Sequence, residues 1–219
     1  MKHTTLLAAA AAIVVSLSSC SENKSGDTAV TDTTATSSTT TVATTETTAP
    51  PMDSAAKMKA WMDYATPGQP HQMLAASDGK WKTETTMWME PGAPPMNSTG
   101  EATNKMIMGG RYQRMTYKSE MMGQPFEGES ITAYDNSKKM FVNTWIDNMG
   151  TGVMQMEGPW DDATKTMTLK GSCKDPITGK ETTMREVYKI VDDKHHEMEM
   201  YSTQDGKESK TMEMKMTKM

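Results

Sequence analysis

The sequence has few of the residues that usually form a hydrophobic core and none of the short motifs that mark common catalytic sites. Residues 52–219 contain only two Leu, five Ile and four Val, and the whole chain has two Phe and two Cys. It lacks a Gly-x-Ser-x-Gly elbow, a phosphate-binding loop, a His-Glu-x-x-His motif and the paired-cysteine spacing of a zinc site. We therefore expect a protein that is not an enzyme.

Cysteine content argues against a disulfide-stabilised protein, and net charge argues against a protein that binds polyanions. Cys20 belongs to an export signal described below, so Cys173 remains as a single thiol and no disulfide framework can form. A lone thiol usually packs as a small apolar side chain. The chain carries 28 acidic and 23 basic residues, a net charge of −5. This balance argues against binding of nucleic acid and against electrostatic attachment to anionic lipid.

The first twenty residues are typical of a bacterial export signal. Lys2 precedes an apolar run at 6–15, which is too short for a membrane-spanning helix of about 20 residues but fits the hydrophobic region of a signal peptide. The segment ends in Leu17-Ser18-Ser19-Cys20, which resembles the bacterial lipobox. The resemblance implies cleavage of residues 1–19 and lipidation of Cys20, whose acyl chains would attach the protein to a membrane. An ordinary signal peptide with a chance cysteine is the alternative.

Residues 21–51 contain 16 Ser or Thr and no aromatic residue. Such a segment cannot bury enough apolar surface to offset the entropy lost on ordering, so we expect a disordered tether between Cys20 and a folded domain at 52–219. Ser21 directly follows the lipidation site, which by analogy favours the outer membrane of a Gram-negative bacterium. The expected location is the cell envelope, and both the periplasmic and the surface orientation stay open.

The folded domain begins with a helical pattern and continues with a strand pattern. A helix is predicted at 55–64, before Pro67, and a second short helix at 70–76. From Trp81 onward the apolar period changes to two, and Gly, Pro, Asp and Asn residues separate the repeats, which predicts strands joined by turns. The ten predicted strands cover 80–90, 97–108, 111–120, 126–134, 140–149, 152–160, 166–174, 181–191, 195–203 and 208–217.

The short connections between these strands predict that each strand pairs antiparallel with the next. An open sheet of ten strands would leave two unpaired edges, whereas closure would leave none. We therefore predict an all-β protein, an antiparallel up-and-down barrel of about ten strands preceded by one or two short helices.

Methionine replaces the missing aliphatic residues. The chain has 25 Met, and five groups alternate along predicted strands: Met87/Met89, Met106/Met108, Met154/Met156, Met198/Met200 and Met212/Met214/Met216. Alternate residues of a strand share one face, and the thioether adapts to irregular packing, so we expect these side chains to fill the core. Thioethers also bind Cu(I), which leaves copper binding as an alternative.

Several short segments carry a resemblance to a known family. They are HQML (71–74), GKW (79–81), MWMEPG (87–92), GGRY (109–112), FEG (126–128), YDN (134–136), TWID (144–147), MGTG (149–152), Gly158 and REVY (185–188). In this order they resemble the family named domain of unknown function 1579, over about 71–217. The resemblance implies a calycin- or lipocalin-like barrel. In calycins a Gly-x-Trp motif, here Gly79 and Trp81, closes the barrel base, often against an Arg from a late strand, here Arg185.

The strand alternation and this resemblance together give a candidate ligand pocket. Its expected lining is Trp81, Phe141, Asn143, Trp145, Asp147, Arg185, Tyr188, His196, Met198 and Met200. In the alternative interpretation, the rings close the barrel and the polar atoms bind each other or water. Related ten-stranded barrels bind haem through a histidine near the end of the chain, which implies His196 as the position for a haem ligand.

We expect a lipid-anchored protein of the cell envelope whose barrel binds a small apolar or amphipathic ligand without catalysis and without a cofactor. Two alternatives belong to other classes. One is a structural or interaction protein of the envelope that uses an outer face and has no pocket. The other is a protein that binds haem or copper.

Overall fold

The computed structural model describes residues 53–219 apart from residue 177. The predicted signal peptide at 1–19, the lipidation site Cys20 and the predicted tether at 21–51 lie outside the described residues. Within the described part of the chain, none of the helices has the length and apolar character needed to cross a membrane.

Two helices precede the sheet, α1 (Ser54–Ala65) and α2 (Gln69–Ala76), as predicted at 55–64 and 70–76. α1 begins where the Asp53 carboxylate accepts a hydrogen bond from the Ala56 N–H at 2.7 Å, which satisfies one of the free donors of the first turn. Pro70 lies in the first turn of α2, where its missing N–H would have no partner in any case.

The rest of the described chain forms eleven strands. Their bounds are β1 Gly79–Met87, β2 Met96–Ile107, β3 Tyr112–Met121, β4 Gln124–Asp135, β5 Met140–Asp147, β6 Met154–Gly158, β7 Trp160–Asp161, β8 Thr166–Lys174, β9 Glu181–Ile190, β10 His195–Gln204 and β11 Lys207–Lys218. Ten of them agree with the predicted strands. The additional strand is β7, which arises because Pro159 interrupts the strand predicted at 152–160.

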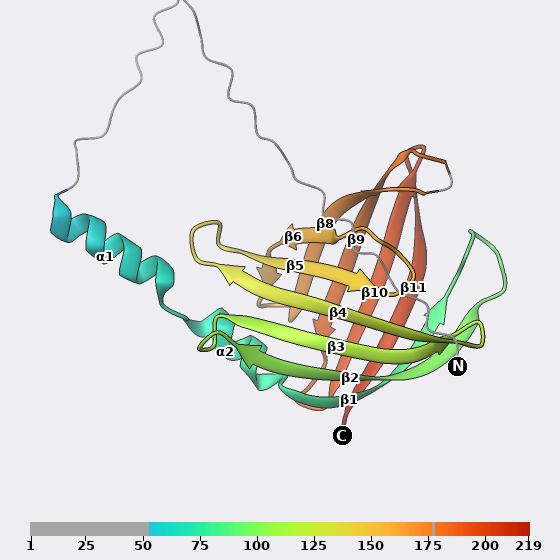
Figure 1. Cartoon of the computed structure of the whole chain (residues 1–219), viewed down its shortest axis with the longest axis horizontal. Coiled ribbons are helices and arrows are strands. Elements are labelled where there is room, and N and C mark those ends of the chain that lie inside the picture. Colours follow the sequence, from blue (N-terminus) through green and yellow to red (C-terminus); the bar gives the residue numbers. More distant parts are fainter. Residues whose placement is uncertain (1–52, 177) are drawn as a thin grey trace, which may run out of the picture. The chain divides into compact units, whose positions relative to one another are not determined.

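All strand pairings are antiparallel, and the strands follow the order β6-β5-β4-β3-β2-β1-β11-β10-β9-β8-β7 in one sheet. β1 pairs with β11 over seven residue pairs, from Trp81 opposite Lys218 to Met87 opposite Met212, and β6 pairs with β8. The sheet therefore closes into the predicted up-and-down barrel. In Figure 1, strands β1–β5 (green to yellow) cross strands β8–β11 (orange to red) at a steep angle.

The pairing of β6 with β8 is short and depends on two glycines. Only Met156 opposite Gly171 and Glu157 opposite Lys170 form this ladder. A Cβ atom at Gly158 would lie 1.9 Å from the Thr168 carbonyl oxygen, and one at Gly171 would lie 2.2 Å from the Gln155 carbonyl oxygen. Both contacts are to backbone, so a side chain at either position would push the two strands apart.

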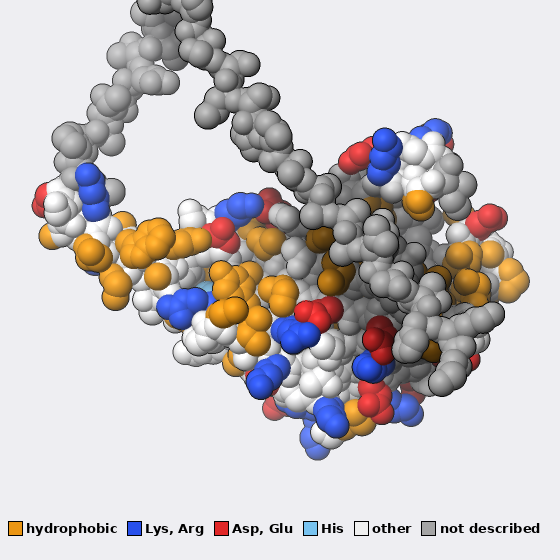
Figure 2. Space-filling model, viewed as in Figure 1, with side chains coloured by type: hydrophobic (Ala, Val, Ile, Leu, Met, Phe, Trp, Pro, Cys, Tyr) orange, Lys and Arg blue, Asp and Glu red, His pale blue; other side chains and the backbone are white. Residues whose placement is uncertain are grey.

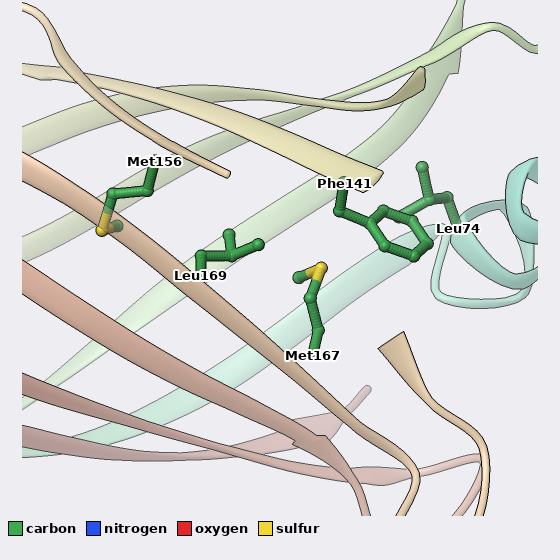
Figure 3. Packing of buried hydrophobic residues seen from close by; sticks show 5 residues of the cluster. All are labelled: Leu74, Phe141, Met156, Met167 and Leu169. Carbon is green, nitrogen blue, oxygen red and sulfur yellow. The ribbon is translucent and has the colours of Figure 1, made fainter. Parts of the chain in front are cut away.

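Two clusters of buried apolar side chains form the core. One connects α2 with β5, β6 and β8 and consists of Leu74, Phe141, Met156, Met167 and Leu169 (Figure 3). The other connects β1–β4 with β11 and consists of Trp81, Ala102, Tyr117, Phe126 and Met216. Methionine contributes three of these ten residues, which confirms the prediction that it serves as a core residue.

The predicted methionine alternation is wrong at two strand ends. Met89 and Met108 are 62% and 71% exposed, because β1 already ends at Met87 and β2 at Ile107. Neither residue therefore continues the alternation of its strand. Met108 instead has a φ of 50° in the turn that follows β2.

We predict that Gly158→Ala and Gly171→Ala each lower the free energy of unfolding by about 2–3 kcal/mol, because the added methyl forces the backbones of β6 and β8 apart. Gly152→Ala is the matched control, since a Cβ there meets nothing within 4 Å, and its effect should stay within about 0.5 kcal/mol. Urea unfolding followed by tryptophan fluorescence measures all three variants. Equal stability of the three would contradict the importance of this close approach.

Candidate functional site

Trp81 of β1 is buried next to the C-terminal end of α2. Its side chain is 1% exposed, and its indole N–H donates a hydrogen bond to the Ser77 carbonyl at 2.9 Å. The ring of His196 lies on it, with ring centroids 4.3 Å apart. The Lys218 ammonium lies 5.5 Å from the centre of the Trp81 ring and donates to the Ala76 carbonyl at 3.0 Å.

A buried polar network fixes α2 to the barrel. The Gln113 side-chain amide donates to the Leu74 carbonyl at 2.6 Å, to Ser77 Oγ at 2.9 Å and to Asp78 Oδ1 at 3.0 Å. Asp78 Oδ2 accepts a hydrogen bond from the Met106 N–H at 2.8 Å. Gln113, Ser77 and Asp78 were not among the predicted site residues.

The partly exposed Tyr188 and the buried His196 form a pair next to Trp81. The Tyr188 hydroxyl lies 2.6 Å from His196 Nδ1. Burial lowers the pKa of His196 to about 4, so the imidazole is neutral near pH 7. With Nε2 protonated, the Tyr188 hydroxyl donates to Nδ1. Burial, and next the nearby Glu186, raise the pKa of Tyr188, so its hydroxyl keeps its proton.

The environment of His196 does not fit haem ligation. His196 is 4% exposed, and its ring packs against those of Trp81 and Tyr188. An iron-ligating histidine would face a space of porphyrin size, which so small an exposure excludes. Within the described residues, no three His, Cys, Asp or Glu side chains converge as a metal site.

The predicted polar residues of β5 bind neighbouring side chains. The Asn143 amide donates to Thr132 Oγ1 at 2.8 Å, and the Trp145 indole N–H donates to Asp147 Oδ2 at 2.8 Å. Trp145 lies so close to Gly128 that a Cβ there would approach the indole to 2.2 Å. These pairs agree with the alternative interpretation, in which the polar atoms satisfy each other. Phe141, at 0% exposure, belongs to the core.

Arg185 does not lie against Trp81, and this expectation is corrected. Arg185 stands opposite Tyr201 of β10, on the other face of β9 from Tyr188. Its guanidinium donates to both Glu208 carboxylate oxygens at 2.8 and 2.7 Å and lies 3.9 Å from the centre of the Tyr201 ring. The position next to Trp81 that the resemblance assigns to Arg185 is taken by Lys218 instead.

The inward faces of the strands differ in exposure between the two sides of the barrel. On β1–β4 the following residues are buried: Trp81, Thr83, Thr85, Ala102, Asn104, Gln113, Tyr117, Phe126, Ser130 and Thr132. On β9–β11 the following remain partly exposed: Met184, Glu186, Tyr188, Met198, Met200, Met212 and Met214. The interior is therefore tightly packed on one side and accessible along the other.

Glu186 is the one acidic residue in this accessible group. It stands opposite Leu169 of β8 and Met200 of β10, and Leu169 is fully buried in the core. Burial raises the pKa of Glu186 to about 7. Strand alternation places Glu186 on the face of Tyr188, but Glu186 was not among the predicted pocket residues. A charged residue on an otherwise apolar face of β9 was the available signal.

A separate cavity of about 360 Å³ lies at the end of the barrel near α2. Its lining includes Met73 of α2, Tyr134 of β4, Phe141 of β5 and Trp160 of β7. Lys165 also lines it. Of the ten predicted pocket residues, only Phe141 reaches it.

We predict that Glu186→Gln stabilises the protein at high pH. Burial raises the pKa of Glu186 from its ordinary value of 4.5 to about 7 in the folded state. The wild-type carboxyl therefore stabilises the fold fully below pH 4.5 and loses this contribution as the pH rises through 7. The variant should be more stable by about 1–3 kcal/mol at pH 8 and equal to wild type at pH 4.

Urea unfolding between pH 4 and 8.5 measures this difference. The control is Glu197→Gln, because Glu197 is exposed on β10 and should leave the pH profile unchanged. In all variants His196, with its pKa lowered to about 4 from 6.5, should cause a loss of stability as the pH falls from 6.5 towards 4. A Glu186→Gln profile parallel to wild type would contradict the desolvation of the carboxyl.

Comparison with known proteins is consistent with this geometry. No curated protein matches the sequence. The crystal structure of Rv2717c from M. tuberculosis is similar, with a TM-score of 0.53 and 14% identity, over 70% of this chain and 99% of that chain. At this identity the likeness shows the barrel fold alone. The model of a family described as "Protein of unknown function (DUF1579)" matches residues 66–218. The chain therefore belongs to the DUF1579 family.

Proposed function

We propose that this protein is a non-enzymatic binding protein that holds a small apolar or amphipathic ligand inside its barrel. The observation that carries the proposal is the accessible inner face of β9–β11, where Met184, Met198 and Met200 keep partly exposed side chains. Small-molecule sites are usually apolar surfaces with a few polar groups, and thioether side chains adapt to ligands of irregular shape.

We further propose that the protein is anchored in the cell envelope through a lipid on Cys20. The support is the signal-like segment 1–19 and the lipobox-like end before Cys20. In this arrangement residues 21–51 join the lipid to the barrel, and the outer membrane is the proposed location.

Helix α1 favours a second candidate function, contact of an outer face with the membrane surface. Met58, Trp61 and Met62 are 63%, 64% and 57% exposed, and their spacing of three and four residues places them on one side of the helix. Figure 2 shows hydrophobic side chains, in orange, along α1. Tryptophan and apolar residues on one helix face are typical of helices that lie in a lipid interface, and the proposed anchor would keep α1 near one.

Binding in the barrel can be tested with N-phenyl-1-naphthylamine, an uncharged apolar fluorophore. We expect its fluorescence to rise on binding to the wild type. Met200→Trp places a larger side chain on the accessible inner face and should weaken binding at least tenfold. Met89→Trp is the control, because Met89 is 62% exposed outside the strands. Circular dichroism checks that both variants fold. No binding to wild type, or equal binding to both variants, would contradict a site inside the barrel.

The role of α1 can be tested with an unlipidated chain, Cys20→Ser, and vesicles of phosphatidylcholine and phosphatidylethanolamine, which carry no net charge. The double variant Trp61→Ser/Met62→Ser should reduce co-sedimentation with vesicles at least fivefold. Ile146→Ser removes an apolar side chain of 49% exposure from β5 and should have little effect. If the α1 variant sediments like its parent, α1 does not bind lipid.

A further inference from the structure

The Glu186 carboxylate belongs to the inner face of the barrel, in the middle of β9. Leu169 and Met200 stand directly opposite on the two neighbouring strands, and Met184 and Tyr188 flank it on the same face of β9. Leu169 is 0% exposed, which shows that this face points into the barrel. Four uncharged side chains thus surround a carboxylate that keeps some accessible surface.

Three outward-facing acids of β10 and β11 have cationic partners. Glu208 binds Arg185 at 2.7 Å, and Glu199 and Glu213 both accept hydrogen bonds from Lys210. Glu181 and Glu197 have no cationic partner among the described residues, but both are exposed to solvent. Glu186 has neither such a partner nor an exposed position.

No cation of the described residues compensates Glu186. No hydrogen bond or ion pair to its carboxylate occurs within 53–219 apart from residue 177. Tyr188 on β9, His196 on β10 and Cys173 on β8 are the titratable groups of the adjacent inner faces. Burial keeps His196 neutral near pH 7 and raises the pKa of Tyr188 and of the Cys173 thiol, so none of the three supplies a positive charge.

A carboxylate without a partner inside a barrel costs stability unless a ligand supplies the opposite charge. We propose that Glu186 binds the cationic head group of an amphipathic ligand, a protonated or quaternary amine whose apolar part lies along the inward methionines of β9–β11. This inference deepens the proposed ligand-binding function and rests on it. The Tyr188 ring and the thioethers near Glu186 suit a soft organic cation.

The remaining polar groups of the predicted pocket support this choice. Asn143, Trp145 and Tyr188 already bind Thr132, Asp147 and His196. Glu186 is thus the inward group with free hydrogen-bonding capacity and charge. A ligand with an anionic head would place two negative charges together, so the site discriminates by charge.

The test compares three probes with the same ten-carbon chain: decyltrimethylammonium, decanol and decanoate. Each displaces N-phenyl-1-naphthylamine from the wild type at pH 8.5, where Glu186 is ionised because its pKa is about 7. We expect decyltrimethylammonium to bind at least tenfold more tightly than decanol, and decanoate most weakly. At pH 5.5 the preference for the ammonium should fall to less than threefold. The ammonium head is permanently charged, so any change of this preference with pH comes from a titrating group of the protein.

Glu186→Gln should remove the preference for decyltrimethylammonium at pH 8.5 and leave the affinity for decanol within twofold. Glu197→Gln, on the exposed face of β10, should keep both affinities. If Glu186→Gln retains the full preference, or if the wild-type preference is independent of pH, Glu186 is not the head-group site. Equal binding of all three probes would overturn this inference but keep the proposed function, whereas no binding of any probe would overturn both.

Discussion

The close approach of β6 and β8 is the contact on which the rest of the barrel depends. The long-range pairing of β1 with β11 extends over seven residue pairs, but β6 and β8 share only two. Gly158 and Gly171 make this narrow seam sterically possible. The buried residues Met156 and Leu169 lie on its two sides. Opening the seam would therefore expose part of the core and leave two unpaired strand edges.

Closure separates the charges of the sheet into two environments. On the outer face, Arg185 and Lys210 bind carboxylates in partly exposed ion pairs, which are individually weak but cost little. On the inner face, the polar side chains of Asn143 and Trp145 are satisfied by neighbours. Glu186 follows neither arrangement and is the charged side chain among the inward residues of β9–β11. A partly desolvated acid without a partner lowers stability, and such groups are enriched where proteins bind ligands.

Methionine forms both part of the core and most of the accessible inner face of this barrel. With few branched aliphatic residues available, the core relies on Met156, Met167 and Met216. The same residue type lines the accessible inner face of β9–β11. Unbranched thioethers lose little by changing rotamer, so one composition can serve both as packed core and as an adaptable ligand surface. The packed side near α2 and Trp81 supplies the rigidity that the other side lacks.

The amino-acid sequence by itself determined the local elements and the architecture. Turn residues and the change of period located both helices and ten strands, short connections required antiparallel neighbours, and the cost of free edges required closure. Only the tertiary structure decided which side chains meet. Alternation assigns a residue to a face, but its partners come from distant strands whose register the local pattern does not contain. Lys218 therefore replaced Arg185 beside Trp81, Gly171 became a closure residue, and Glu186 was left without a partner.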